Sequence, residues 1–250
     1  MRVCRRGQRP GGRKNNTLER VVDLVFEAGW LRKTVRSGWA FLGSGQEDVA
    51  QHSFRVAFIG YVLAKRAGAN PEHTALLGLL HDLHEARTSD LNYMNQRYTN
   101  KDERRAQADA VAGTGFEEDV LAAYDEFEAR ESLEARLAKD ADQLDLLFNL
   151  KEELDKGNRF AQDWIDTAVE RLRTAEAREL CAQMLRTDHN RWWFGHVDRR
   201  WWVNRREETP EQPGQACHGL VQGLAQGRAG MARRRIRRPK VCRMSFARHK

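Results

Sequence analysis

An all-α fold is predicted for this chain, a compact bundle of about six to eight helices. Its 250 residues include only 19 glycines and 5 prolines, and 40% hydrophobic with 32% charged residues suits a helical protein better than a sandwich or barrel. Apolar residues recur at spacings of three and four, and residues that cap helices stand at the ends of these runs. The length suits one large domain or two small ones.

The first expected helix begins at Thr17, a good capping residue, and ends near Gly29. A basic loop with an aromatic side chain follows over residues 31–45. The helix expected over residues 47–68 repeats apolar side chains at helical spacing, and His52 lies on that buried stripe. A histidine in such a place is a core residue or a ligand, and spacing alone leaves both open.

Asn70 and Pro71 begin the next helix, because asparagine suits the cap and proline the first helical position. The core-facing leucines of this helix are expected at Leu76, Leu79, Leu80 and Leu83. The polar stretch 87–100 suits the rim or lid of an active site, or an ordinary connection between helices.

Further helices are expected over residues 101–111, 116–130, 131–156 and 160–185, the last range as two helices broken near Thr174. The aromatic residues 192–194 are expected to dock the end of the domain, because a tryptophan pair buries a large area. The folded domain is accordingly expected over residues 17–195.

Both ends of the chain are basic, whereas the middle is acidic. Residues 1–14 carry six Lys and Arg and no acid, and residues 196–250 carry fourteen against four acids. The net charge of +7 therefore leaves −9 for residues 15–195. The segments 1–16 and 196–250 lack apolar periodicity and are expected to be disordered tails. Nucleic-acid binding by these tails is an alternative, but solvated tails are the favoured interpretation.

The cysteine and hydropathy patterns favour a cytoplasmic protein. The four cysteines are far apart and form no C-x-x-C pair, which fits a reducing compartment and argues against a cysteine-based zinc site. No apolar run is long enough to span a membrane, and the basic first residues are not followed by the apolar core of a secretory signal. We therefore expect no membrane partner.

Three of the expected helices carry candidate metal ligands: His52, His81, Asp82 and Asp142. The His-Asp pair ends an apolar run, where a buried charge without a partner is costly, and a divalent metal removes that cost. Two imidazoles and two carboxylates suit one divalent transition metal, such as Mn, Co, Fe, Zn or Ni, better than Mg or Ca. On spacing alone, the aspartates of residues 140–145 could instead all face water.

The spacing of these residues resembles the signature of the HD-domain metal-dependent phosphohydrolases. Three segments carry the resemblance: EDVAQHS at 47–53, LHDLHEARTSD at 80–90 and AKDADQ at 138–143. They are similar to the branch that contains the 5'-deoxynucleotidases, and the likeness runs from about Leu18 to Phe194. Gln51 stands where that branch usually has glutamate.

The resemblance implies that the four candidate ligands hold the metal and that Glu85 and Asp90 are catalytic. Glu85 would position or deprotonate the attacking water, and Asp90 would assist at the leaving 5'-oxygen or the sugar. The family binds substrate with an arginine and a tryptophan before the first ligand, and Arg36 and Trp39 are the candidates here. Two residues separate them, whereas the bacterial enzymes have them adjacent. From spacing alone, a solvent-facing Arg36 and a core Trp39 stay open.

The activity that the resemblance implies is removal of the 5'-phosphate of (deoxy)nucleoside monophosphates by metal-activated water. A nucleotide would then be the substrate, and relatives of this kind are often homodimers. The alternatives are an HD hydrolase for another phosphate ester, such as a cyclic nucleotide or a nucleoside triphosphate, and a protein that binds nucleic acid through its basic ends.

Overall fold

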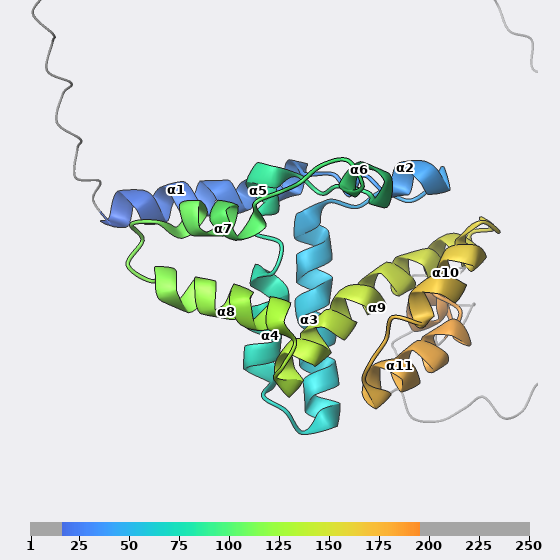
Figure 1. Ribbon diagram of the computed structural model, residues 1–250. Helices are drawn as coiled ribbons and strands as arrows, with labels where there is room; N and C mark the ends of the chain where they lie inside the picture. The colour runs from blue at the N-terminus through green and yellow to red at the C-terminus, as the bar shows by residue number, and fades with distance from the viewer. Residues whose placement is uncertain (1–16, 196–250) are drawn as a thin grey trace, which may run out of the picture. The chain divides into compact units, whose positions relative to one another are not determined.

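The computed structural model describes residues 17–195, and in this range the regular secondary structure is helical apart from one isolated β-bridge between Val35 and Asp48 (Figure 1). The predicted all-α fold is confirmed. Eight of the described helices have nine residues or more: α1 (Thr17–Trp30), α3 (Val49–Ala67), α4 (Pro71–Leu80), α7 (Glu103–Val111), α8 (Glu117–Ala129), α9 (Leu133–Asp155), α10 (Ala161–Val169) and α11 (Ala175–Leu185). The shorter elements are a 3-10 turn (Leu31–Lys33), α2 (Trp39–Leu42), α5 (Glu85–Thr88), α6 (Tyr93–Gln96) and α12 (Arg191–Phe194). The predicted tails, 1–16 and 196–250, lie outside the described residues.

Helix α3 is central and packs against both α4 and α9 (Figure 1). It begins at Val49 because Asp48 accepts a hydrogen bond from the Gln51 backbone at 2.8 Å, while the Gln51 side chain accepts one from the Asp48 backbone at 3.2 Å. It ends at Gly68, whose φ of 71° is the left-handed conformation that glycine favours. Gln51 therefore closes a capping box where the resembled family usually has glutamate.

The largest hydrophobic cluster joins α3 to α9, α10 and α11. Its members on α3 and α9 are fully or almost fully buried, among them Val56, Ile59, Leu63, Leu144 and Leu147. Helix α9 contacts α3, α4, α8, α10 and α11, so it has neighbours on nearly all sides. This position leaves few α9 side chains in water.

Helix α4 departs from its predicted pattern in two ways. It ends at Leu80, and a turn over residues 81–84 precedes α5, so His81 and Glu85 do not share one continuous helix. The predicted core stripe is wrong for two of its four leucines, because Leu76 and Leu79 are 44% and 51% exposed, whereas Leu83 is buried. Leu77, which was not predicted, is 1% exposed. Leucines stand on several faces of this short helix, so periodicity alone does not select the buried face.

The close contact between α3 and α4 depends on Gly78. A Cβ atom at this position would lie 3.2 Å from both the backbone nitrogen and the Cα atom of Ala57, and 3.0 Å from Cγ1 of Val56. The Gly78 carbonyl also accepts a hydrogen bond from Nδ1 of His81 at 2.8 Å. The same glycine therefore sets the helix spacing and orients a candidate ligand.

We expect Gly78→Ala to destabilise the protein in urea unfolding. Overpacking against a fixed helix backbone costs about 1–3 kcal/mol, more than the roughly 0.5–1 kcal/mol that alanine gains over glycine in a helix. Gly29→Ala in α1 is the matched control, since the nearest atom to its Cβ is a guanidinium nitrogen at 3.7 Å. Equal stability changes in the two variants would contradict the close-approach argument.

Large apolar side chains near both ends of the described range are exposed. In α1 only Leu24 is buried, while Leu18 and Phe26 are 67% and 77% exposed. At the other end of the described range, Trp192 is 81% exposed, so this side chain does not dock the domain as expected. Within residues 17–195, no helix combines the length and apolar character needed to cross a membrane.

Candidate metal centre and active site

His52 lies on α3 and is fully buried. Its Nδ1 atom is 2.6 Å from Oδ2 of Asp145, so Nδ1 carries the proton that this hydrogen bond needs. Its Nε2 atom lies 3.4 Å from Oδ1 of Asp142 and 3.5 Å from Oδ2 of Asp82. Burial and Arg36 lower the pKa of His52, but the neighbouring carboxylates of Asp142 and Asp145 outweigh them and raise it to about 10. The carboxylates around this ring therefore stabilise a positive charge at this position, on the imidazole or on a bound cation.

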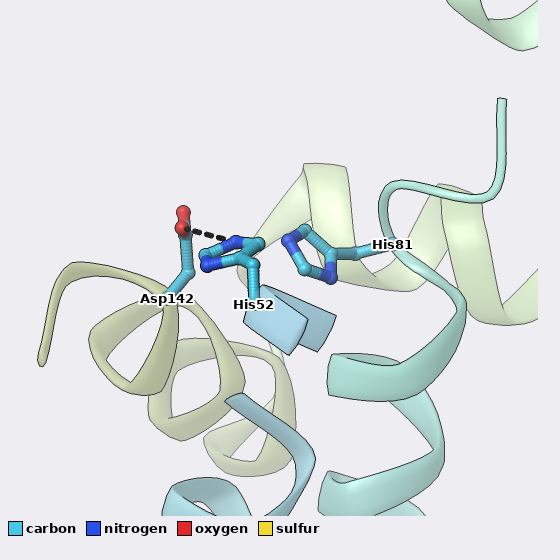
Figure 2. Close-up of side chains that lie close together, drawn as sticks. All are labelled: His52, His81 and Asp142. Carbon is cyan, nitrogen blue, oxygen red and sulfur yellow. Dashed lines mark ion pairs between the residues drawn. The ribbon is translucent and has the colours of Figure 1, made fainter. Parts of the chain in front are cut away.

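His81 follows the last residue of α4 and is 3% exposed. Its Nδ1 atom donates to the Gly78 carbonyl, which leaves the Nε2 lone pair facing the same centre, 3.0 Å from Oδ2 of Asp82. The two imidazole rings meet edge to face, with centroids 5.3 Å apart. Figure 2 shows the two rings and the Asp142 carboxylate turned toward one another from three elements.

Both nearby aspartates are ionised. Burial raises the pKa of Asp142, but the Lys139 ammonium and the nearby His52 outweigh it and hold this pKa well below its usual range. Lys139 Nζ lies 3.0 Å from Asp142 Oδ2. Burial likewise raises the pKa of Asp82, and the neighbouring His81 outweighs it and lowers this pKa.

This arrangement fits a divalent metal. One ligand atom each from His52, His81 and Asp142 lie within 4.8 Å of one another, and Asp82 Oδ2 is near both imidazoles. Nε2 of each histidine is buried and has no hydrogen-bond partner, which is costly unless another ligand takes the lone pair. The structure thus brings all four predicted ligands together, and metal ligation itself stays a prediction.

Sequence reasoning did not identify Asp145, which is fully buried and holds His52. Arg55 donates to the second oxygen of Asp145 and also to Glu152 at 2.9 Å. Burial raises the pKa of Asp145, but its contacts with His52 and Arg55 lower it. Its place one turn after Asp142 is the signal that could have identified it, because both carboxylates then reach α3.

We expect Asp145→Asn to weaken divalent-metal affinity by about 10- to 100-fold, as loss of a group that orients a histidine ligand commonly does. The amide removes the negative charge that fixes the Nδ1 proton of His52. A titration against a chelating indicator would measure this, with exposed Asp166→Asn as the matched control. Unchanged affinity in Asp145→Asn would show that His52 needs no such support.

A cavity of about 550 Å³ opens beside the centre. Glu85 lines it, is 7% exposed, and has a buried Oε2 atom without a hydrogen-bond partner. Burial, followed by the charges of Asp82 and Asp90, raises the pKa of Glu85 to about 9. Lys101, which sequence reasoning did not identify, places Nζ 3.8 Å from Oε1 of Glu85 and donates to the Ser89 carbonyl.

Arg36 and Asp90 face the same cavity from different segments. Arg36 lies 3.7 Å from Asp82 and 3.5 Å from the buried Glu47, so it is not the solvent-facing side chain that spacing left open. Burial lowers the pKa of Arg36, but Asp82 and Asp90 outweigh it, so the group stays charged. Asp90 Oδ2 accepts a hydrogen bond from the Ser37 backbone at 3.0 Å and thereby holds the arginine loop in place.

Trp39 is a core residue that also borders the cavity. It is 7% exposed, belongs to the largest hydrophobic cluster, and also lines the cavity. Gly45 makes its position possible, because a Cβ at residue 45 would lie 2.9 Å from the indole ring.

His84 also lies in the cavity wall, and its ring contacts the Tyr124 ring. Burial lowers the pKa of this histidine to about 4.

Comparison with known proteins gives consistent results. A family model described as an HD domain matches residues 28–183. The chain is 23% identical to the 5'-deoxynucleotidase HDDC2 of Bos taurus over 181 residues, which cover 69% of this chain and 86% of that protein. It is 29% identical to a 5'-deoxynucleotidase of Vibrio parahaemolyticus over 171 residues, 60% of this chain and 87% of that one.

Two solved structures from Pyrococcus species align with most of the folded part of this chain. A conserved hypothetical protein from Pyrococcus furiosus aligns with a TM-score of 0.57 and 30% identity, and the match covers 66% of this chain and 99% of that one. The PH0347 protein of Pyrococcus horikoshii aligns with a TM-score of 0.55 and 26% identity, covering 66% of this chain and 98% of that one.

Proposed function

Because the chain belongs to the HD-domain family and is a metal-dependent phosphohydrolase, we propose that it removes the 5'-phosphate of (deoxy)nucleoside monophosphates. The observation that carries this proposal is the cavity of about 550 Å³, in which Arg36, Lys101 and Lys139 stand among the carboxylates beside the two histidines. Cationic side chains next to a metal centre suit a phosphate group.

The proposed ligands are His52, His81, Asp82 and Asp142, and the metal is one divalent transition metal. When bound, such a metal supplies Lewis-acid polarisation of a phosphoryl oxygen and lowers the pKa of water. We assign Arg36 to the phosphate, since its guanidinium stays charged and faces the cavity. Its field stabilises negative charge that grows on the phosphoryl oxygens during hydrolysis.

Glu85 is the proposed proton acceptor for the attacking water, with Oε2 as the accepting atom. Burial and the charges of Asp82 and Asp90 raise the pKa of Glu85 to about 9 and outweigh Arg36 and Lys101, which lower it. A divalent cation bound at the neighbouring centre would lower this pKa and favour the basic form of Glu85. We assign Asp90 to the leaving 5'-oxygen or the sugar, and Trp39, which borders the cavity, to the nucleoside. The folded catalytic domain in this proposal is residues 17–195.

The test is phosphate release from a panel of deoxy- and ribonucleoside 5'-monophosphates. Protein stripped of metal and refilled with Mn, Co, Zn or Mg should release phosphate only when a suitable metal is present. The ratio of kcat/KM between deoxy and ribo substrates reports the sugar preference of the Trp39 wall. If the metal-loaded protein released no phosphate from any monophosphate, the proposed substrate class would be wrong.

A further inference from the structure

A second cavity, of about 480 Å³, adjoins the first and is strongly cationic. Four arginines line it, together with Lys139 and the carboxylate Asp140: Arg130, Arg136, Arg171 and Arg173. The two cavities share Arg130, Lys139 and Gln143. The shared α9 residues 139 and 143 lie one turn apart, so one helix forms part of both walls.

Neutral groups orient two of the four arginines of the second cavity, Arg136 and Arg171. Arg136 Nη1 donates to the Glu131 carbonyl at 2.8 Å. Arg171 Nη1 donates to the Tyr93 hydroxyl and to Gln143 Oε1, the latter at 3.3 Å, and its guanidinium stacks 5.1 Å from the Tyr93 ring centroid. Neutral acceptors fix these side chains without cancelling their charge.

The one carboxylate of this wall is already engaged. Asp140 accepts hydrogen bonds from the backbone nitrogens of Arg173 and Thr174 at 2.9 and 2.7 Å, and from the Thr174 hydroxyl at 2.6 Å. It thereby fixes the segment that carries Arg173. Among residues 17–195 no carboxylate forms an ion pair with any of the four arginines, whereas Arg36 and Arg55 near the metal centre are paired. The four arginines of the second cavity thus carry positive charge that no ion pair offsets, and two of their side chains are held in place.

We propose that the second cavity is an anion subsite that takes a second phosphate of the substrate. The preferred substrate class is then a nucleoside 3',5'-bisphosphate, whose 5'-phosphate is hydrolysed in the first cavity while its other phosphate is held by the arginines. A planar guanidinium can donate two hydrogen bonds to two oxygens of one phosphate. Several guanidinium groups therefore suit a doubly charged phosphate better than a singly charged carboxylate as the ligand. Because the two cavities share Arg130, Lys139 and Gln143, a single substrate with two phosphates can occupy both. This inference rests on the proposed 5'-phosphohydrolase function.

The test compares deoxyadenosine 3',5'-bisphosphate with deoxyadenosine 5'-monophosphate on the metal-loaded protein. We expect kcat/KM for release of the 5'-phosphate to be roughly 10- to 100-fold higher for the bisphosphate, the size expected for one or more charged hydrogen bonds. The double variant Arg136→Ala/Arg173→Ala should lose this preference, mainly through KM, and keep wild-type activity on the monophosphate. Both arginines line the second cavity alone.

Arg186→Ala, at the end of α11 and outside both cavities, is the matched control and should keep the preference. Equal kcat/KM for both substrates, or a preference that survives in the double variant, would overturn the subsite. Stimulation of monophosphate hydrolysis by inorganic tripolyphosphate without a bisphosphate preference would overturn it too, because the cavity would then take a separate ligand.

Calorimetric binding of the bisphosphate separates the two proposals. If no monophosphate is hydrolysed but the double variant binds the bisphosphate roughly 10-fold or more weakly than wild type, the subsite stands and the proposed hydrolysis fails. If monophosphates are hydrolysed and the double variant binds the bisphosphate as tightly as wild type, the subsite fails and the hydrolysis stands. Circular dichroism of the variants confirms that they are folded.

Discussion

Replacing Asp82 with asparagine is expected to abolish both metal binding and phosphate release. Asp82 Oδ2 lies 3.0 Å from Nε2 of His81 and 3.5 Å from Nε2 of His52, so its charge faces the point where both imidazole lone pairs meet. The amide has the same shape but removes the anionic ligand. The remaining groups would then hold a divalent cation with one negative charge fewer in a buried site.

Thermal unfolding gives a readout of this variant that is independent of activity. A metal present at 100 times its dissociation constant stabilises wild type by about 2.7 kcal/mol, which corresponds to about 5–10 °C in Tm for a protein of this size. We expect this metal-dependent shift to vanish in Asp82→Asn. Asp109→Asn, an exposed position on α7, should keep both the shift and the activity. An Asp82→Asn protein that still shifted with metal would show that this carboxylate is not a ligand.

The carboxylates of α9 show how far the sequence determines the site. Their neighbours and spacing predicted Asp142, and the structure places this residue beside the two histidines. The alternative in which all three aspartates face water is wrong. Asp140 holds the start of α11, and Asp145 holds His52. Sequence could not assign these partners, because α9 has neighbours on nearly all sides and each aspartate meets a different element.

Prediction was weakest where a helix is apolar on more than one face. Helix α1 carries six Leu, Val and Phe side chains, yet only Leu24 among them is buried. In α4 the selected leucines Leu76 and Leu79 are the exposed ones. Which apolar face packs inward depends on the contact made by Gly78 and on the position of α8 and α9, and a single helix sequence contains neither.

The segments before and after the ligands were harder to predict than the ligands themselves. The residues of the loop left the roles of Arg36 and Trp39 open, and the resemblance then favoured substrate binding. Both line the cavity because α2 and its flanking turns bring them there. Lys101 was missed, although it lies near Glu85, because it lies outside the spacing that defines the three motif segments. Contacts between distant loops depend on the packing of the whole bundle, so local patterns do not predict them.

Glu85→Gln is expected to separate chemistry from metal binding. Glu85 is buried at the cavity wall with Oε2 unpartnered, so the isosteric amide keeps the packing but cannot accept a proton. We expect kcat to fall by about 10²- to 10⁴-fold, as for loss of a general acid–base group. The dissociation constant of the metal and the KM for substrate should stay near wild type, because the proposed ligands and Arg36 are untouched.

The steady-state rates and a metal titration on the same preparation measure these two effects together. Glu118→Gln, an exposed position on α8, controls for the loss of one carboxylate and should behave as wild type. A Glu85→Gln variant that loses metal would make Glu85 part of the metal centre instead of the proton acceptor. A variant with unchanged kcat would move the proton-accepting role to another group in the cavity, and Asp90 is the other carboxylate that we assign to the reaction.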